Sequence, residues 1–330
     1  MIITLFLFIM MAMTLFKPTM HFQFDKKQTM RLKGILAILI VMYHTKMNVV
    51  GGFIDTYWGY VIVSMFMFVT GYGLMASYTI KGEVYLQTYF RHRFLKLFPP
   101  LALATTLFMI IESFAGHGSF ISWYRYFKQT GIPPIGATWY IYCIIFFYLF
   151  FYISMKIGKN KIKSIAILII LSLLFSTFIR NVAKWDDFWW CSTFAFLVGV
   201  MYEICEKQLF QKLSNTNYLR IYSAILLGVL SGLAYLYYVY SNLQSLYLFI
   251  NILPMTLVVI IYNWGIPEGR IFTFLGSISY EIFIVHDIFI TFLYTFTIPN
   301  GIIKFCIVIG LSIPSAYALN KFCSYLLKKI

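Results

Sequence analysis

Long apolar stretches separated by short polar segments recur along the whole chain. A helix needs roughly 20 mostly apolar residues to cross a bilayer, and most of these stretches reach that length. Because a spanning segment must satisfy its own backbone hydrogen bonds, the pattern predicts an all-α fold, a polytopic transmembrane helical bundle of about 10–11 spans. The stretches lie at residues 2–16, 32–48, 57–78, 97–114, 137–155, 164–180, 188–204, 219–240, 245–263, 272–297 and 301–320.

The stretch at 2–16 is the shortest, and it differs from a cleaved signal segment. Lys17 and Pro18 follow it, and no small-residue cleavage site is present. We therefore interpret it as an additional span. No linker rich in Gly, Ser or Pro interrupts the chain, and the longest outer loop, about 115–136, is too short to form a domain. The sequence thus predicts a single membrane domain over residues 1–330.

Composition excludes several other classes of protein. Of the 330 residues, 61% are hydrophobic and only 11% charged, whereas a soluble domain carries roughly 25% charged residues. So few polar groups cannot cover a water-facing surface, which excludes a soluble enzyme and a disordered chain. The 5 cysteines are scattered without a CxxC motif or a nearby His at ligand spacing, so we expect neither a disulfide framework nor a metal site.

The charge is strongly basic, with 26 Lys and Arg against 11 Asp and Glu. In a membrane protein such an excess marks cytoplasmic loops, and nucleic acid need not be the partner. If the segment between the first two stretches is cytoplasmic, 20 of the 26 cations fall on the cytoplasmic side. The distribution therefore predicts a multi-pass protein of the cell membrane with a cytoplasmic C-terminus.

Ionisable residues inside spans are costly and are therefore candidates for function. His44 lies eleven residues beyond Lys33, which is roughly 16 Å along a helix and about half a membrane. A histidine at that depth can act as a general base near neutral pH. The alternative is a histidine near the outer interface that only meets water.

The stretch at 272–297 carries Glu281, His286 and Asp287. Glu281 and His286 are five residues apart, about 140° around a helix, so they do not share a face. They serve different partners, or Glu281 supports the fold; a polar cluster that only packs helices is the alternative. We expect Glu112, near the outer end of its span, to be solvated.

Four cations, Lys33, Arg91, Arg93 and Lys96, lie near predicted cytoplasmic ends of spans. Arg93 and Lys96 are three residues apart and therefore share a helix face. Paired cations at a membrane edge suit a phosphate-bearing ligand, since Arg gives forked contacts and Lys a point charge. The alternative is ordinary positive-inside anchoring.

Prolines and glycines predict local features of the helices. Pro99-Pro100 suits the first turn of a helix, whereas Pro254 and Pro314 lie inside stretches and predict kinks. Gly71 and Gly73 allow another helix to approach closely or the helix to break.

Several motifs together resemble the acyltransferase 3 family of integral membrane acyltransferases. They are Lys33-x10-His44, Phe68-Val69-Thr70-Gly71-Tyr72, Arg93-x-x-Lys96 before Pro99, Trp139-Tyr140 and Gly276-Ser277-Ile278-Ser279-Tyr280-Glu281 running on to His286. Their order and spacing match over about residues 30–320, with residues 1–29 as an addition. The chain departs from the family at Lys96, where Arg is usual. It also lacks the esterase-like domain of some members, so we expect the membrane domain alone to complete transfer.

The resemblance implies an O-acyltransferase that moves an acyl group, usually acetyl, from cytoplasmic acyl-CoA to a carbohydrate hydroxyl. The acceptor would be a cell-surface polysaccharide, peptidoglycan or a lipid-linked glycan. Lys33, Arg91, Arg93 and Lys96 would bind the CoA phosphates, with His44, Glu281 and His286 as catalytic candidates. We expect His44 to act as a general base rather than to carry the acyl group covalently.

A transporter or polysaccharide flippase is the alternative function. Kinked helices and a proton relay of His44, Glu281 and His286 suit a proton-coupled transporter. However, a transporter should show an internal inverted repeat, and none is evident. It also has no need of an anion site at one cytoplasmic edge.

Overall fold

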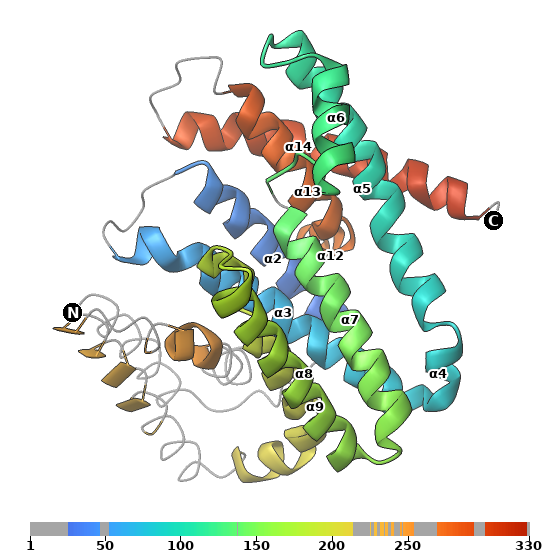
Figure 1. Ribbon diagram of the computed structural model, residues 1–330, viewed down its shortest axis with the longest axis vertical. Coiled ribbons are helices and arrows are strands. Elements are labelled where there is room, and N and C mark those ends of the chain that lie inside the picture. Colours follow the sequence, from blue (N-terminus) through green and yellow to red (C-terminus); the bar gives the residue numbers. More distant parts are fainter. Residues whose placement is uncertain are drawn as a thin grey trace. The chain divides into compact units, whose positions relative to one another are not determined.

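A computed structural model (Figure 1) describes residues 26–46, 53–136, 138–213, 269–293 and 301–328, together with single positions and short runs between 225 and 253. Within these ranges the chain is helical and forms no strand. The prediction of an all-α protein is therefore confirmed. The predicted stretch at 2–16 lies outside the described residues, as do most of 219–240 and 245–263.

Six helical segments among the described residues are long and apolar enough to cross a membrane. A seventh candidate is a pair of helices, α12 (Arg270–Ser277) and α13 (Ser279–Leu293), bent by 73° at the break between them. The multi-span prediction is thus confirmed for the described part of the chain. The six segments are Gly59–Lys81, Tyr89–Phe114, Thr138–Gly158, Lys161–Val182, Asp187–Glu206 and Gly301–Leu327.

The helix that carries Lys33 and His44 is α2 (Lys26–His44), and its two ends differ in character. The N-terminal turns hold Lys26, Lys27, Arg31 and Lys33, and this charge keeps α2 out of the six apolar segments. Its remaining turns are apolar, with Leu36, Ala37, Ile40 and Val41 buried. A charged end and an apolar end suit a helix that begins at a membrane surface and continues inward.

Helix α5 (Tyr89–Phe114) corrects the expectation that Pro99 and Pro100 begin a helix. The helix starts at Tyr89, and both prolines lie inside it. Since proline has no N–H, the carbonyls of Leu95 and Lys96 lose the donors that a regular helix would supply. The prolines therefore interrupt the regular hydrogen bonding of the helix next to the cation Lys96. Pro314, as expected, lies inside a helix, α14 (Gly301–Leu327); Pro254 lies outside the described residues.

The chain forms two compact units, each assembled from separated segments. The first comprises Met1–Gln28, Tyr60–Tyr85 and Phe146–Pro267, and the second comprises Thr29–Gly59, Leu86–Ile145 and Glu268–Ile330. The candidate residues Lys33, His44, Arg91, Arg93, Lys96, Glu281 and His286 all belong to the second unit. The functional site can therefore be described within one unit.

In the first unit, glycines bring α3 (Phe53–Lys81) and α9 (Phe194–Leu213) into backbone contact. A Cβ on Gly71 would lie 2.2 Å from the carbonyl oxygen of Phe196, and one on Gly199 would lie 2.1 Å from that of Phe68. The close approach predicted for Gly71 is confirmed. At Gly73, by contrast, a Cβ would meet no atom of the described residues within 4 Å, and no such close approach is seen there.

In the second unit, α13 packs against both α14 and α5 (Figure 1). Helix α2 approaches α12 through two more glycines. A Cβ on Gly34 would lie 2.4 Å from the Phe272 carbonyl oxygen, and one on Gly276 would lie 1.8 Å from that of Met30. No side chain fits at either position, so α2 is held directly against the helix pair that carries Glu281 and His286.

Candidate active site

The structure brings two predicted site residues, His44 and His286, into ring contact. His44 is the last residue of α2, and His286 lies in the middle of α13. Their ring centroids are 5.2 Å apart, with the rings tilted by 40°. The side chain of His44 is exposed, whereas His286 is only 1% exposed. One imidazole is thus accessible to an incoming molecule, and the other lies buried behind it.

The hydrogen bond of His286 defines which of its ring nitrogens carries a proton. Its Nδ1 lies 3.2 Å from the carbonyl oxygen of Ile282. A carbonyl oxygen can only accept, so Nδ1 is the donor, and Nε2 of the neutral ring bears a lone pair. That Nε2 is buried and has no hydrogen-bond partner among the described residues. A buried acceptor without a donor is costly in a structural role and useful in a reactive one.

Asp287, next to His286, has a positioning role in the structure. Its Oδ2 accepts a hydrogen bond of 2.6 Å from the backbone N–H of Gly136, just before α7 (Thr138–Gly158). A Cβ on Gly136 would lie 3.0 Å from that oxygen, so glycine allows the close contact. The carboxylate therefore ties the start of α7 to the helix that carries His286.

Three of the four predicted phosphate-binding cations form a cluster. Lys33, half-buried on α2, lies within electrostatic range of Arg93 and Lys96 on α5. The guanidinium of Arg93 also lies 6.0 Å from the ring centroid of Tyr89. Arg91 is exposed on the same helix. Like charges repel when they are brought together, so such a cluster favours an anionic ligand that neutralises it.

Glu281 points to partners other than His286, as its angular offset predicts. Its side chain is buried, and its Oε1 accepts a hydrogen bond of 2.8 Å from Nδ2 of Asn320 on α14. Glu281 also lies within electrostatic range of Lys96. This carboxylate thus connects α13 to α14 and faces the cation cluster. Of the predicted catalytic residues, only His44 and His286 contact each other.

Sequence reasoning missed Asn320 and the role of Tyr280. The Tyr280 hydroxyl donates a hydrogen bond of 2.9 Å to the carbonyl oxygen of Leu97, which lies between the cations of α5 and its prolines. Tyr280 belongs to the motif at 276–281, so the sequence did indicate that this residue has a role. Asn320 is an uncharged side chain near the end of a span, and nothing in its local sequence indicates its partner.

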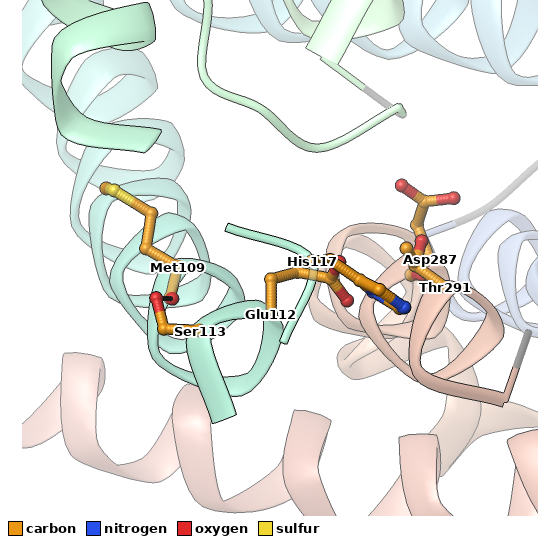
Figure 2. Close-up of polar contacts among 6 residues, drawn as sticks. All are labelled: Met109, Glu112, Ser113, His117, Asp287 and Thr291. Atoms are coloured by element: carbon orange, nitrogen blue, oxygen red, sulfur yellow. Dashed lines mark hydrogen bonds and ion pairs between the residues drawn. The ribbon is translucent and has the colours of Figure 1, made fainter. Parts of the chain in front are cut away.

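The expectation that Glu112 is solvated is wrong. Glu112 is only 1% exposed, and its Oε2 lies 2.8 Å from Nδ1 of His117. Figure 2 shows this pair together with Asp287 and Thr291 of α13, the helix against which α5 packs. The chain turns back after α5, so a histidine five residues later covers the carboxylate. Position along a span does not reveal this local turn.

Among the described residues, no three His, Cys, Asp or Glu side chains group closely enough to hold a metal ion. The polar groups that the second unit does bring together are a histidine pair, a cation cluster and a buried carboxylate. These side chains can exchange protons and bind an anion.

The fold and this site define an integral membrane protein in which a histidine pair on α2 and α13 and a cation cluster on α2 and α5 belong to the same unit. A family model described as "Acyltransferase domain" matches residues 31–321, nearly the whole chain. The chain therefore belongs to the acyltransferase 3 family, and the resemblance seen in its motifs is confirmed. Searches of curated proteins and of solved structures found no match.

Proposed function

We propose that this membrane acyltransferase transfers an acetyl group from cytoplasmic acyl-CoA to a hydroxyl of a cell-surface or lipid-linked carbohydrate. The observation that carries the proposal is the contact between an exposed histidine, His44, and a buried histidine, His286, whose Nε2 is unpartnered among the described residues. An acyl transfer to a hydroxyl needs a base that removes the hydroxyl proton, and imidazole serves that purpose near neutral pH.

The cation cluster supports acyl-CoA as the donor. CoA carries several phosphate charges, and Lys33, Arg93 and Lys96 concentrate positive charge where α2 and α5 approach each other. Arg93 supplies a forked donor, and the two lysines supply point charges. Exposed Arg91 adds a fourth cation on α5. Glu281 lies within electrostatic range of Lys96 and limits the net charge of the cluster.

The chemistry assigns distinct roles to the two histidines. His44 accepts the proton of the acceptor hydroxyl as its oxygen attacks the thioester carbonyl carbon. The carbon–sulfur bond then breaks, and the CoA thiolate leaves and takes up a proton, so an ester and free CoA are formed. The Nε2 lone pair of His286 is suited to accept a hydrogen bond from the protonated His44 and so to stabilise its charge. General-base catalysis of this kind contributes roughly 10²–10⁴-fold to a rate.

Replacement of His44 in the native host tests the proposal. The O-acetyl content of each surface glycan is measured by NMR in cells that carry the wild-type protein, His44→Ala or no protein. We expect His44→Ala to match the deletion while the protein still inserts in the membrane. A control is His92→Ala, since His92 is exposed and its Nδ1 bonds the Thr88 carbonyl of its own turn. Unchanged O-acetylation in His44→Ala cells would refute the role of His44, and unchanged O-acetylation in the deletion would refute the function itself.

A further inference from the structure

A second group of polar and aromatic side chains lies in the first unit, at the connection between two candidate spans. The spans are Lys161–Val182 and Asp187–Glu206, and the sequence between and around them reads RNVAKWDDFWW over 180–190. The segment combines four large aromatic rings with two carboxylates and two cations. The proposed chemistry at His44 uses none of these side chains.

The backbone of this segment departs from a regular helix. Helix α8 (Lys161–Thr177) continues into a π-helical turn, Phe178–Val182, in which the Ala183 N–H bonds the Phe178 carbonyl at 2.9 Å. Lys184 then adopts a φ of 53°, a conformation that costs energy for a residue other than glycine. A short 3-10 turn, Asp187–Trp189, follows. Turns of the π type occur frequently at functional sites because they redirect side chains.

The aromatic rings form a surface graded from exposed to buried. Trp185 is 43% exposed, and its ring centroid lies 4.5 Å from that of half-buried Trp189. Phe188 stacks against Trp189 with centroids 6.3 Å apart. Trp190 is buried, and its ring centroid lies 4.1 Å from that of Tyr247. Trp185 and Trp189 thus form the outer, more exposed part of the aromatic group.

A carboxylate with unused accepting capacity lies beside these rings. Half-buried Asp187 receives the hydroxyls of Tyr60 and Tyr247 at 3.4 and 3.5 Å, one at each oxygen. Ordinary O–H···O bonds measure about 2.5–3.0 Å, so both contacts are long. A carboxylate accepts about four hydrogen bonds in all. Asp187 therefore retains capacity for further donors, and the two tyrosines hold it in place.

Charge at the segment is balanced. The guanidinium of Arg180 lies 5.1 Å from the ring centroid of Trp190, close to the residues that surround Asp187. Lys184 adds a second cation, and exposed Asp186 a second anion. A ligand suited to such a surface is neutral overall, with an apolar face for the rings and hydroxyls for the charged groups.

A sugar ring has this chemistry, since its C–H groups form an apolar face and its hydroxyls project from the rim. We infer that the segment Arg180–Trp190, with Tyr60 and Tyr247, binds a neutral sugar unit, with Trp185 and Trp189 as the stacking surface and Asp187 as the hydroxyl acceptor. The assignment to the acceptor carbohydrate rests on the proposed function. The binding itself does not depend on acyl transfer.

Aromatic residues at span ends also anchor proteins in the membrane interface, and that role is the competing one. Anchoring needs exposed rings but makes no use of a carboxylate held by two tyrosines. The two roles therefore differ in their dependence on Asp187. Sugar binding requires the Asp187 carboxylate, whereas anchoring does not.

Glycan binding by the purified full-length protein in nanodiscs, without acyl-CoA, tests the inference. The probe is an array of immobilised oligosaccharides that contain neutral hexose, N-acetylhexosamine or uronic acid units. We expect a neutral oligosaccharide to bind, and Asp187→Asn and Trp189→Ala each to weaken that binding at least about tenfold, in keeping with the loss of one good hydrogen bond or stacking contact. Tyr124→Ala is the control, an exposed aromatic residue on α6 (Phe120–Thr130) in the second unit.

The outcomes separate this inference from the proposed function. Glycan binding is measured without acyl-CoA and therefore does not depend on transfer, whereas O-acetylation in His44→Ala cells reports transfer. If no glycan binds, or if Asp187→Asn binds as the wild type does, the sugar site is refuted, whatever the result for O-acetylation. Binding to uronic acid units alone would contradict the assignment of a neutral ligand. Size-exclusion profiles of the variants in detergent establish that each protein is folded.

Discussion

The imidazole rings of His44 and His286 lie 5.2 Å apart between their centroids, although they come from opposite ends of the chain. The exposed ring can meet a substrate, and the buried ring has a lone pair on Nε2 with no donor among the described residues. A charged His44 therefore has an acceptor beside it. The contribution of each ring to catalysis can therefore be tested by substitution.

The variant His286→Asn separates the reactive role of His286 from a structural one. The Asn amide lies near the position of Nδ1 and can still donate to the Ile282 carbonyl, but it has no counterpart of Nε2. We expect kcat to fall about 10²-fold or more, the lower range of general-base effects, with little change in the KM for the acceptor. Initial rates of acetyl transfer in nanodiscs provide the measurement. A kcat within a few-fold of the wild-type value would contradict a reactive Nε2.

Neutral replacements in the cation cluster should weaken the donor complex. We expect Lys33→Gln and Arg93→Gln each to raise the Kd of acetyl-CoA about tenfold at low salt, because each removes a charge-assisted contact. The effect should shrink as ionic strength rises, since salt screens charge pairs. Titration calorimetry gives the Kd. The control is Lys128→Gln, an exposed cation on α6; an equal effect there would show that net charge alone attracts the donor.

Two glycines of α3, two residues apart, should differ sharply in their tolerance of alanine. At Gly71 the new Cβ would lie 2.2 Å from the Phe196 carbonyl oxygen, whereas at Gly73 it would meet nothing within 4 Å in the part of the chain that the structure describes. We expect Gly71→Ala to destabilise the protein by about 1–3 kcal/mol, the usual cost of overpacking, and Gly73→Ala to leave stability nearly unchanged. Thermal unfolding in detergent measures both. Equal melting temperatures would contradict the backbone contact between α3 and α9.

The hydrogen bond between Asn320 and Glu281 can be tested by exchanging its donor and acceptor. In Asn320→Asp two carboxylates face each other, so we expect a loss of stability of about 1–3 kcal/mol or more. In the double variant Glu281→Gln/Asn320→Asp the amide and the carboxylate change places, and much of the stability should return. Unfolding curves of the wild type, Asn320→Asp and the double variant measure these differences in stability. A double variant no more stable than Asn320→Asp would show that Glu281 needs its own charge, for example beside Lys96.

Local pattern predicts the helices and the candidate residues because both depend on short-range sequence. Apolar length predicts the spans. The 140° offset between Glu281 and His286 predicts that these two side chains have different partners, and in the structure Glu281 contacts Asn320 while His286 contacts His44. The glycine of the motif at 276–281 also has a physical reason, since its missing side chain admits the Met30 carbonyl.

What the sequence does not reveal is which distant residues meet. Nothing local to Asn320 indicates Glu281, which lies 39 residues away. The contact of Glu112 with His117 is local, but it depends on a turn after α5 that the apolar pattern does not predict. The prediction that Pro99 and Pro100 begin a helix was wrong for a different reason. Proline is preferred in the first turn of a helix but is tolerated inside one when other groups use the freed carbonyls, and α5 begins at Tyr89.

The interleaving of the two compact units has a consequence for biosynthesis. The second unit needs Thr29–Gly59, which the ribosome delivers early, and Glu268–Ile330, which it delivers last. His44 is therefore made long before His286, and most of the first unit, Tyr60–Tyr85 and Phe146–Pro267, is translated between them. A chain that stalls before α12 has therefore made Lys33, Arg93 and Lys96 but not α13, the helix that completes the histidine pair.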